Sequence, residues 1–219
     1  LNCSSNKLKT LNLNQNIALT KLICSYNKLD NLNISQNKRL TKLTCSSNQL
    51  NQLNLNQNID LAKLICSSNQ LDNLNISQNT QLTEVICSYN KLDSLNTSNN
   101  LKLVELICSE NNIKLMNISK NIKLKELYCS HNGLDSLDFS NNKKLTNINC
   151  SNNQLNQLDI SQNTELTELN CSYNYLDNLN ILNNTQLAYL QCFENKLTEL
   201  KISNNSNLTE LNCSHNPVS

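Results

Sequence analysis

The chain has almost none of the residues that globular proteins use to bend their backbones. Its 219 residues include one Gly, one Pro and no Trp. A typical domain uses far more Gly and Pro, because irregular loops need their special backbone angles. The scarcity excludes a loop-rich globule. We expect Asn, which is abundant here, to form the turns, because it tolerates left-handed and locally hydrogen-bonded backbone.

An excess of charge of one sign is also lacking, as are long apolar runs. The chain has 18 Lys and Arg residues against 17 Asp and Glu residues, a formal net charge of +1. A near-neutral chain offers no broad field to attract nucleic acid or an anionic membrane, so we expect neither as a partner. No apolar run approaches the roughly 18–20 residues that span a bilayer, so we expect no membrane insertion.

What the chain has instead is a strict internal repeat. A Cys recurs every 21 residues without insertion or deletion, and an Asn stands three residues after each one. A second Asn column and a Leu column keep the same phase, beginning at Asn16 and Leu19. A fixed period of this length indicates a solenoid, in which each rung packs only on its neighbours. The cysteines are Cys3, Cys24, Cys45, Cys66, Cys87, Cys108, Cys129, Cys150, Cys171, Cys192 and Cys213.

Residues 40–60 show the pattern within one rung. The first half reads LTKLTCSSNQL, an LxxLxCxxNxL pattern, and LxxLxLxxN repeats from Leu50. The first half resembles the conserved segment of leucine-rich repeats, with Cys in the third apolar position. The nested halves of 10 and 11 residues resemble the 21-residue IRREKO-type bacterial subclass of that family. The resemblance covers the whole chain. It implies a right-handed parallel solenoid with an asparagine ladder at the Asn three residues after Cys.

The spacing of apolar residues predicts the same class of fold. Leu and Cys two residues apart point to one face of a strand, and the second half has a Leu-x-Ile or Leu-x-Leu of the same period. Neither half has the 3.6-residue period of a helix. We therefore expect a mainly β fold with little or no helix. It should consist of about ten to eleven 21-residue rungs, whose short parallel strands form two sheets facing each other across a narrow core.

The repeat runs from end to end, which predicts a single leucine-rich-repeat domain over residues 1–219. The chain opens inside an expected strand at Leu1 and stops just after the last Asn corner. Neither end has the polar capping unit that keeps solenoids from stacking on one another, and there is no initiator Met or leader. We expect the chain to be part of a longer protein. The alternative is that its ends self-associate.

The eleven cysteines can be interpreted as disulfides, as metal ligands or as buried thiols. The odd number prevents full internal pairing, and the 21-residue spacing matches no CxxC ligand pair. Each Cys occupies an inward position that such repeats otherwise fill with Leu or Ile, where a small polarizable side chain suits a thin core. We expect buried free thiols, and no metal or cofactor.

Residues suited to catalysis are scarce. The chain has two histidines, His131 and His215, and contains no nucleophile elbow, phosphate-binding Gly loop or HExxH motif. Glu110 and His131 occupy adjacent rungs and could hold a weakly bound divalent ion, although a solvated surface pair is the ordinary interpretation. We expect no enzymatic activity.

The outward positions of the Cys-bearing strand vary between rungs and therefore carry any specificity. The position before Cys is mostly Ile or Tyr over residues 23–128 and amide afterwards, while the position three before Cys changes from Lys to Glu. Contiguous exposed apolar residues usually mark an interaction site, although Ile also favours strands for its own sake. The predicted partner-binding face consists of Ile23, Tyr26, Ile65, Ile86, Tyr89, Ile107, Tyr128 and Tyr173.

The outward column of the second half is almost uniform. It runs from Asn12 to Asn180 with Asp at positions 138 and 159, and ends at Lys201. A uniform polar column indicates structure or spacing and not recognition. The alternative is a regular hydrogen-bonding array for a periodic ligand such as a glycan or ice.

These features favour a protein-binding module of a bacterial secreted or cell-surface protein, with a protein partner held on the outward face of the Cys-bearing strands. The bacterial and extracellular placement follows from the family resemblance and from an Asn-, Lys- and Ile-rich composition typical of an AT-rich genome. The alternative is a structural element: a spacer, a stalk or a self-assembling fibre subunit with no specific ligand. Concentration-dependent light scattering would separate the two, because a fibre subunit grows end to end.

Overall fold

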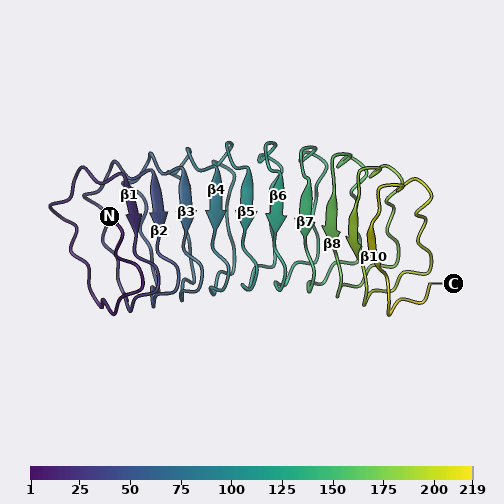
Figure 1. The fold of residues 1–219 in the computed structure, drawn as a ribbon, viewed down its shortest axis with the longest axis horizontal. Coiled ribbons are helices and arrows are strands. Elements are labelled where there is room, and N and C mark those ends of the chain that lie inside the picture. The colour runs from purple at the N-terminus through teal and green to yellow at the C-terminus, as the bar shows by residue number, and fades with distance from the viewer. Residues whose placement is uncertain (219) are drawn as a thin grey trace.

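The computed structural model describes residues 1–218 and shows one parallel sheet that runs along the whole rod (Figure 1). Ten strands follow in chain order, and each residue pairs with the one 21 positions later, as Leu22 does with Leu43. The expected mainly β solenoid is confirmed, and residues 1–218 form no helix. The strands are β1 (Lys21–Ile23), β2 (Lys42–Thr44), β3 (Lys63–Ile65), β4 (Glu84–Ile86), β5 (Glu105–Ile107), β6 (Glu126–Tyr128), β7 (Asn147–Asn149), β8 (Glu168–Asn170), β9 (Tyr189–Gln191) and β10 (Glu210–Asn212).

Each strand is three residues long and points its central residue into the core. In β5, Leu106 is fully buried, while Glu105 and Ile107 lie on the outer surface and are partly exposed. Cys108 follows at the next inward position and is also fully buried. Because alternate residues of a strand point to opposite faces, the Leu-x-Cys spacing buries both side chains. An isolated parallel bridge between Asn2 and Ile23 adds the start of one more rung before β1.

The second half of each rung does not form a strand, so the expected second sheet is wrong. Leu53 and Leu55 do point inward and are buried. The backbone then turns at once: Asn58 N–H donates to the Leu55 carbonyl, and Leu61 N–H donates to the Asn58 carbonyl. Both bonds lie within one stretch of chain, and they occupy backbone groups that a second sheet would need for pairing between rungs.

The uniform polar column of the second half forms these turns. Asn33 Oδ1 accepts a hydrogen bond from Ser35 N–H at 3.1 Å, and the equivalent side chain does the same in nine successive rungs. Asp138 and Asp159 supply the same acceptor. Hydrogen bonds from the side chain and backbone of the Ser two residues later lower the pKa of both carboxyls. These local bonds support a structural interpretation of the column.

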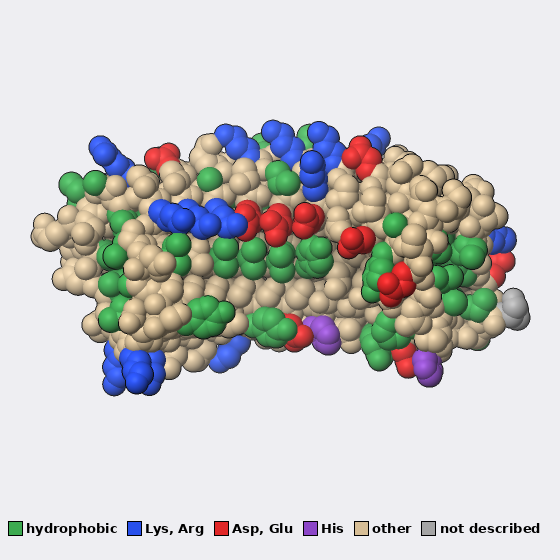
Figure 2. Space-filling model, in the orientation of Figure 1, with side chains coloured by type: hydrophobic (Ala, Val, Ile, Leu, Met, Phe, Trp, Pro, Cys, Tyr) green, Lys and Arg blue, Asp and Glu red, His purple; other side chains and the backbone are tan. Residues whose placement is uncertain are grey.

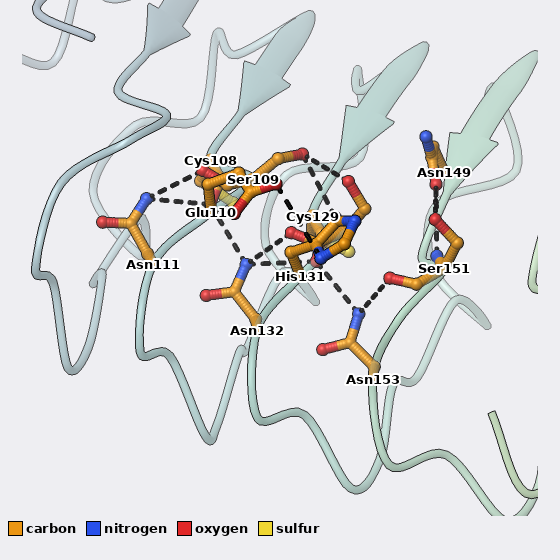
Figure 3. Close-up of polar contacts among 11 residues, drawn as sticks. Cys108, Ser109, Glu110, Asn111, Cys129, His131, Asn132, Asn149, Ser151 and Asn153 are labelled. Atoms are coloured by element: carbon orange, nitrogen blue, oxygen red, sulfur yellow. Dashed lines mark hydrogen bonds and ion pairs between the residues drawn. The ribbon is translucent and has the colours of Figure 1, made fainter. Parts of the chain in front are cut away.

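From Asn27 onward, the Asn three residues after each Cys is buried or partly buried and joins successive rungs (Figure 3). Asn132 Nδ2 donates to the carbonyls of Cys129 in its own rung and Cys108 in the preceding one, both at 3.1 Å. Its Oδ1 accepts from Ile113 N–H at 3.0 Å. One amide therefore satisfies three backbone groups that the strands leave open. The same bonds recur along the rod.

The second Asn column is buried from Asn37 to Asn205, and its side chains also bond between rungs. Asn100 Nδ2 donates to the carbonyls of Ile76 at 3.1 Å and Asn79 at 2.9 Å, while its Oδ1 has no partner. Asn121 differs, because Thr97 Oγ1 donates to its Oδ1 at 2.7 Å. Thr97 stands at a core position that the other rungs give to Leu, Ile or Phe. Its hydroxyl is accommodated in the core because it finds the amide oxygen of the next rung.

The left-handed turn of each rung is made by the residue before the first Asn, not by an Asn as expected. Eleven non-Gly residues have φ between 51° and 57°, and all stand two positions after a Cys. Asn152 is the one Asn among them in residues 1–218, whereas Tyr26, Tyr89 and His131 adopt the same conformation. The hydrogen bonds of the following Asn fix the backbone there, so the side chain at this corner is free to vary.

Glycine at such a corner should stabilise the fold. Ser68 has a φ of 54°, a conformation that disfavours an L-residue by about 1–2 kcal/mol. We expect Ser68→Gly to raise the free energy of unfolding by about 0.5–1 kcal/mol after the entropy that Gly loses on folding. Ser67→Gly, one residue earlier and outside the left-handed region, is the matched control and should lower it. Urea denaturation of both variants tests this, and shifts in the same direction would contradict it.

Candidate partner-binding face

Three columns of side chains cover the outward face of β1–β6. We call the first residues of these strands the charge column, their third residues the apolar column, and the residues two after each Cys the corner column. In-register pairing sets equivalent residues side by side, as with Lys63 and Glu84 or Ile65 and Ile86. Figure 2 shows the charged row and the hydrophobic row running parallel along the rod.

The charge column is divided into two blocks of opposite sign. Lys21, Lys42 and Lys63 begin β1, β2 and β3, and the next three strands begin with Glu. Figure 2 shows the change from basic to acidic side chains along this row. Lys63 and Glu84 form an ion pair where the blocks meet. Within each block, like charges lie about 4.8 Å apart and repel, so the arrangement does not favour the stacking of the rungs.

Glu105 shows this repulsion most clearly. Partial burial and the carboxylates of Glu84 and Glu126 raise the pKa of Glu105, while Lys63 opposes the shift. A carboxyl with a higher pKa in the folded than in the unfolded chain adds stability at low pH, and that stability is lost as the pH rises through its folded pKa. The ionised Glu105 therefore lowers the stability of the fold at neutral pH.

Neutralising this carboxyl should stabilise the chain in a pH-dependent way. We expect Glu105→Gln to raise the free energy of unfolding at pH 7, because the repulsion from both neighbouring carboxylates disappears. The gain should vanish below about pH 4, where a Glu side chain is protonated even in the unfolded chain. Urea denaturation across this pH range measures it. A variant less stable than the natural chain at pH 7 would show that Glu105 makes a favourable contact.

Five of the eight predicted face residues lie together in the apolar column. Ile23, Ile65, Ile86, Ile107 and Tyr128 are each partly exposed, and Thr44 interrupts them at β2. Partial burial, with the carboxylates of nearby glutamates, raises the pKa of the Tyr128 hydroxyl. The column therefore presents a narrow, half-buried apolar strip beside the two charge blocks.

The three remaining residues stand in the corner column and its continuation. Tyr26 and Tyr89 are 65% and 60% exposed and lie three rungs apart beside the apolar column. Tyr173 lies four rungs beyond Tyr89, and its ring meets the ring of Phe193 edge-on, with centroids 5.0 Å apart. The structure thus groups seven of the predicted residues on β1–β6 and separates Tyr173 from them.

The corner column also holds the residues considered for metal binding. Glu110 Oε1 lies 3.8 Å from His131 Nδ1, as the sequence led us to expect for adjacent rungs (Figure 3). Glu194 and His215 repeat this arrangement at the same distance. Across residues 1–218, no group of three or more His, Cys, Asp or Glu side chains is placed to hold a metal ion.

Two surface features were not predicted from the sequence. A hollow of about 270 Å³ opens on the outward face over β7 and β8, with Tyr128 and Tyr189 among its walls. Four apolar side chains also stand directly after Asn of the second Asn column, away from the strands. They are 53–63% exposed, and Lys38 and Thr80 interrupt the series. Only the sequence phase could have revealed the second feature, because isolated exposed apolar residues are common on folded proteins. It consists of Ile17, Ile59, Leu101 and Ile122.

All eleven cysteines are free thiols, and nine are buried in one line along the core. Burial raises the pKa of the Cys87 and Cys150 thiols to about 12. The pKa of Cys66 is raised in the same direction, first by burial and then by its neighbours Cys45 and Cys87. A thiol that stays protonated is a poor nucleophile and metal ligand. The nine buried cysteines are free thiols in the core, as expected.

Solved structures match this arrangement closely. The functional domain of InlJ from Listeria monocytogenes, which includes a cysteine ladder, matches 99% of the chain at 33% identity with a TM-score of 0.81. A leucine-rich-repeat protein of Leptospira interrogans matches 99% of it at 26% identity with a TM-score of 0.85. The chain is similar in sequence and fold to bacterial leucine-rich-repeat proteins. YopM, a leucine-rich effector protein from Yersinia pestis, matches 97% of it at 28% identity with a TM-score of 0.81.

The match extends over only part of each of these proteins. The chain spans 58% of the InlJ chain, 66% of the Leptospira chain and 59% of the YopM chain. No family model matches the sequence, and no curated protein matches it. In residues 1–218 there is no helix of the length and apolarity needed to cross a membrane. The repeat period of 21 residues is confirmed by the pairing of every strand with the next.

Proposed function

We propose that the chain is a protein-binding leucine-rich-repeat module that holds its partner on the outward face of β1–β6. The charge column carries this proposal. Its blocks of like charge work against the stacking of the rungs, whereas every inward position favours it. On this face, charged side chains that lower the stability of the fold lie beside a half-exposed apolar strip. This combination is typical of a protein interface.

The similar structures support this class of role. They are leucine-rich-repeat proteins of bacteria, and YopM is an effector protein. We therefore propose a bacterial origin and a place outside the cell or on its surface. We further propose that the chain acts by binding and not by catalysis. A spacer or fibre role is the alternative, and it predicts end-to-end growth that is independent of the face.

Acidic substitutions on the face should remove binding without unfolding the chain. We expect Ile86→Asp with Ile107→Asp to abolish capture of proteins from an extract by the immobilised chain, because each places a charge in the centre of the apolar column. The matched control is Ile59→Asp with Ile122→Asp, the same changes at exposed sites off the face. Thermal unfolding checks that both variants fold.

The control variant should capture the same proteins as the natural chain, identified by mass spectrometry. Equal capture by both variants, or equal loss in both, would overturn the proposed face. Light scattering that keeps rising with concentration in all three proteins would instead support the fibre alternative.

A further inference from the structure

The charge column changes sign at the boundary between β3 and β4. At equal distances on either side of this boundary, a Lys on one side corresponds to a Glu on the other. Lys63 and Glu84 adjoin this line, Lys42 and Glu105 are the next pair out, and the third pair follows in β1 and β6. A half-turn about an axis lying in the face, parallel to the strands at this boundary, exchanges β3 with β4, β2 with β5 and β1 with β6. It therefore brings every Lys of one copy opposite a Glu of the other.

We propose that the partner held on this face is a second copy of the chain, related by that two-fold axis. The inference rests on the proposed function, because it uses the same face, and it adds the identity of one partner. Each copy contributes three Lys and three Glu to the contact, which makes six ion pairs between the copies. At the axis, Lys63 of each copy meets Glu84 of the other.

The other two columns match under the same rotation. Because the axis is parallel to the strands, the apolar column faces its own copy: Ile65 meets Ile86, and Thr44 meets Ile107. At its ends, Ile23 meets Tyr128. No charge of the charge column is turned onto an apolar residue.

The corner column also fits. Tyr26 of one copy comes opposite His131 of the other, and Tyr89 comes opposite Ser68. These two tyrosines are the most exposed aromatic side chains of the face, and each gains a neighbour without a like-charge contact. The contacts of all three columns, which differ in chemistry, are thus compatible with the same two-fold axis.

The other face-to-face two-fold is excluded by charge. An axis along the rod sets each strand opposite its own copy. Placed over the charge column, it makes Lys42 face Lys42 and Glu105 face Glu105. Placed over the apolar column, it makes Glu105 face Glu110 and brings no Lys of this column opposite a Glu. Like charges brought together in this way oppose association. Only the axis parallel to the strands at the β3–β4 boundary turns the separation of charge into attraction.

The contact is small, so the dimer should be weak. Six rungs at about 4.8 Å and a width of about 16 Å give roughly 900 Å² buried over both copies. This buried area is typical of transient complexes and smaller than that of stable ones. We expect a Kd on the order of 10 µM. Surface ion pairs are screened by salt, so the Kd should rise when the ionic strength goes from about 0.05 M to about 0.5 M.

Charge reversal tests the axis directly. Lys42→Glu and Glu105→Lys each create two like-charge contacts per dimer, and we expect each to weaken self-association at least about 100-fold in sedimentation velocity. Mixed together, the two variants should form a dimer with a Kd within about 5-fold of the natural one. In the mixed dimer the two reversed side chains face each other as an ion pair, and the unchanged Lys42 and Glu105 form the second pair. Lys143→Glu, an exposed reversal off the face, is the control and should leave the Kd unchanged.

A mixture that stays monomeric, or single variants that dimerise like the natural chain, would overturn the two-fold axis. The proposed function is tested separately, because the Ile86 and Ile107 variant reports on capture of other proteins. Loss of that capture together with a monomeric mixture would leave the face as a binding site and remove only the second copy as its partner. Assemblies larger than a dimer that are insensitive to both reversals would also contradict the proposal.

Discussion

Replacing Asn111 with Ala is expected to lower the free energy of unfolding by about 4 kcal/mol. The Asn111 amide donates to the carbonyls of Cys87 at 3.2 Å and Cys108 at 3.0 Å, and its oxygen accepts from Leu92 N–H at 3.0 Å. Each buried group left without a partner destabilises the fold by about 1–3 kcal/mol. Three such groups, in two adjacent rungs, would be left unsatisfied by one substitution.

The control for this variant is its neighbour. Asn112 is exposed, and only its backbone N–H makes a bond between rungs, to the Leu92 carbonyl. Asn112→Ala should therefore change the free energy of unfolding by less than about 0.5 kcal/mol. Asn111→Asp keeps the acceptor but loses both donors and buries a charge, so it should be at least as destabilising as Ala. Chemical denaturation gives all three values, and a loss equal to that of Asn112→Ala would show that water can replace the amide.

Truncation of Phe139 should have a comparable effect. This side chain is fully buried at a position that most rungs give to Ile or Leu, so the adjacent rungs have packed around a larger group. We expect Phe139→Ala to lower the free energy of unfolding by about 3–5 kcal/mol, from lost burial and from the cavity that remains. Because each rung is supported only by its neighbours, the cavity should weaken the contacts on both sides of this rung.

Two further substitutions make the measurement specific. Phe139→Ile restores the side chain of neighbouring rungs and should lower the free energy of unfolding by only about 1 kcal/mol. Phe193→Ala removes the other phenylalanine, which is partly exposed and packs against Tyr173, and about 1 kcal/mol is expected there too. Equal losses at both phenylalanines would contradict the tight core inferred for the rung of Phe139.

The inward side of the rung could be predicted from the sequence, because the repeat shows the same apolar residue types at the same positions in rung after rung. Leu106 and Cys108 both lie inside because residues two apart on a strand point to the same face. The prediction of a second sheet was wrong because the apolar period of the second half does not determine which backbone groups form hydrogen bonds. The backbone after Leu55 closes on itself within one rung. Two equal apolar patterns therefore produce one sheet and one set of turns.

The left-handed corner could not be predicted, because no residue type marks it. Tyr26, Glu110 and Asn152 share one backbone conformation, which the Asn after them imposes through bonds between rungs. The face was predicted only as a set of outward residues. Tyr173 was included by its type, although four rungs separate it from Tyr89. The in-register pairing of the strands places the Lys and Glu blocks side by side on one face, with their boundary between β3 and β4.

The central claim is that the inward columns and the two Asn columns carry the fold, while the charge column serves binding. Its most direct test is the free energy of unfolding, at pH 7, of a variant in which all six charge-column residues are Gln. We predict a value equal to or higher than that of the natural chain, because two blocks of like charge are removed. A value lower by more than about 1 kcal/mol would show that these charges hold the fold together and would contradict the claim.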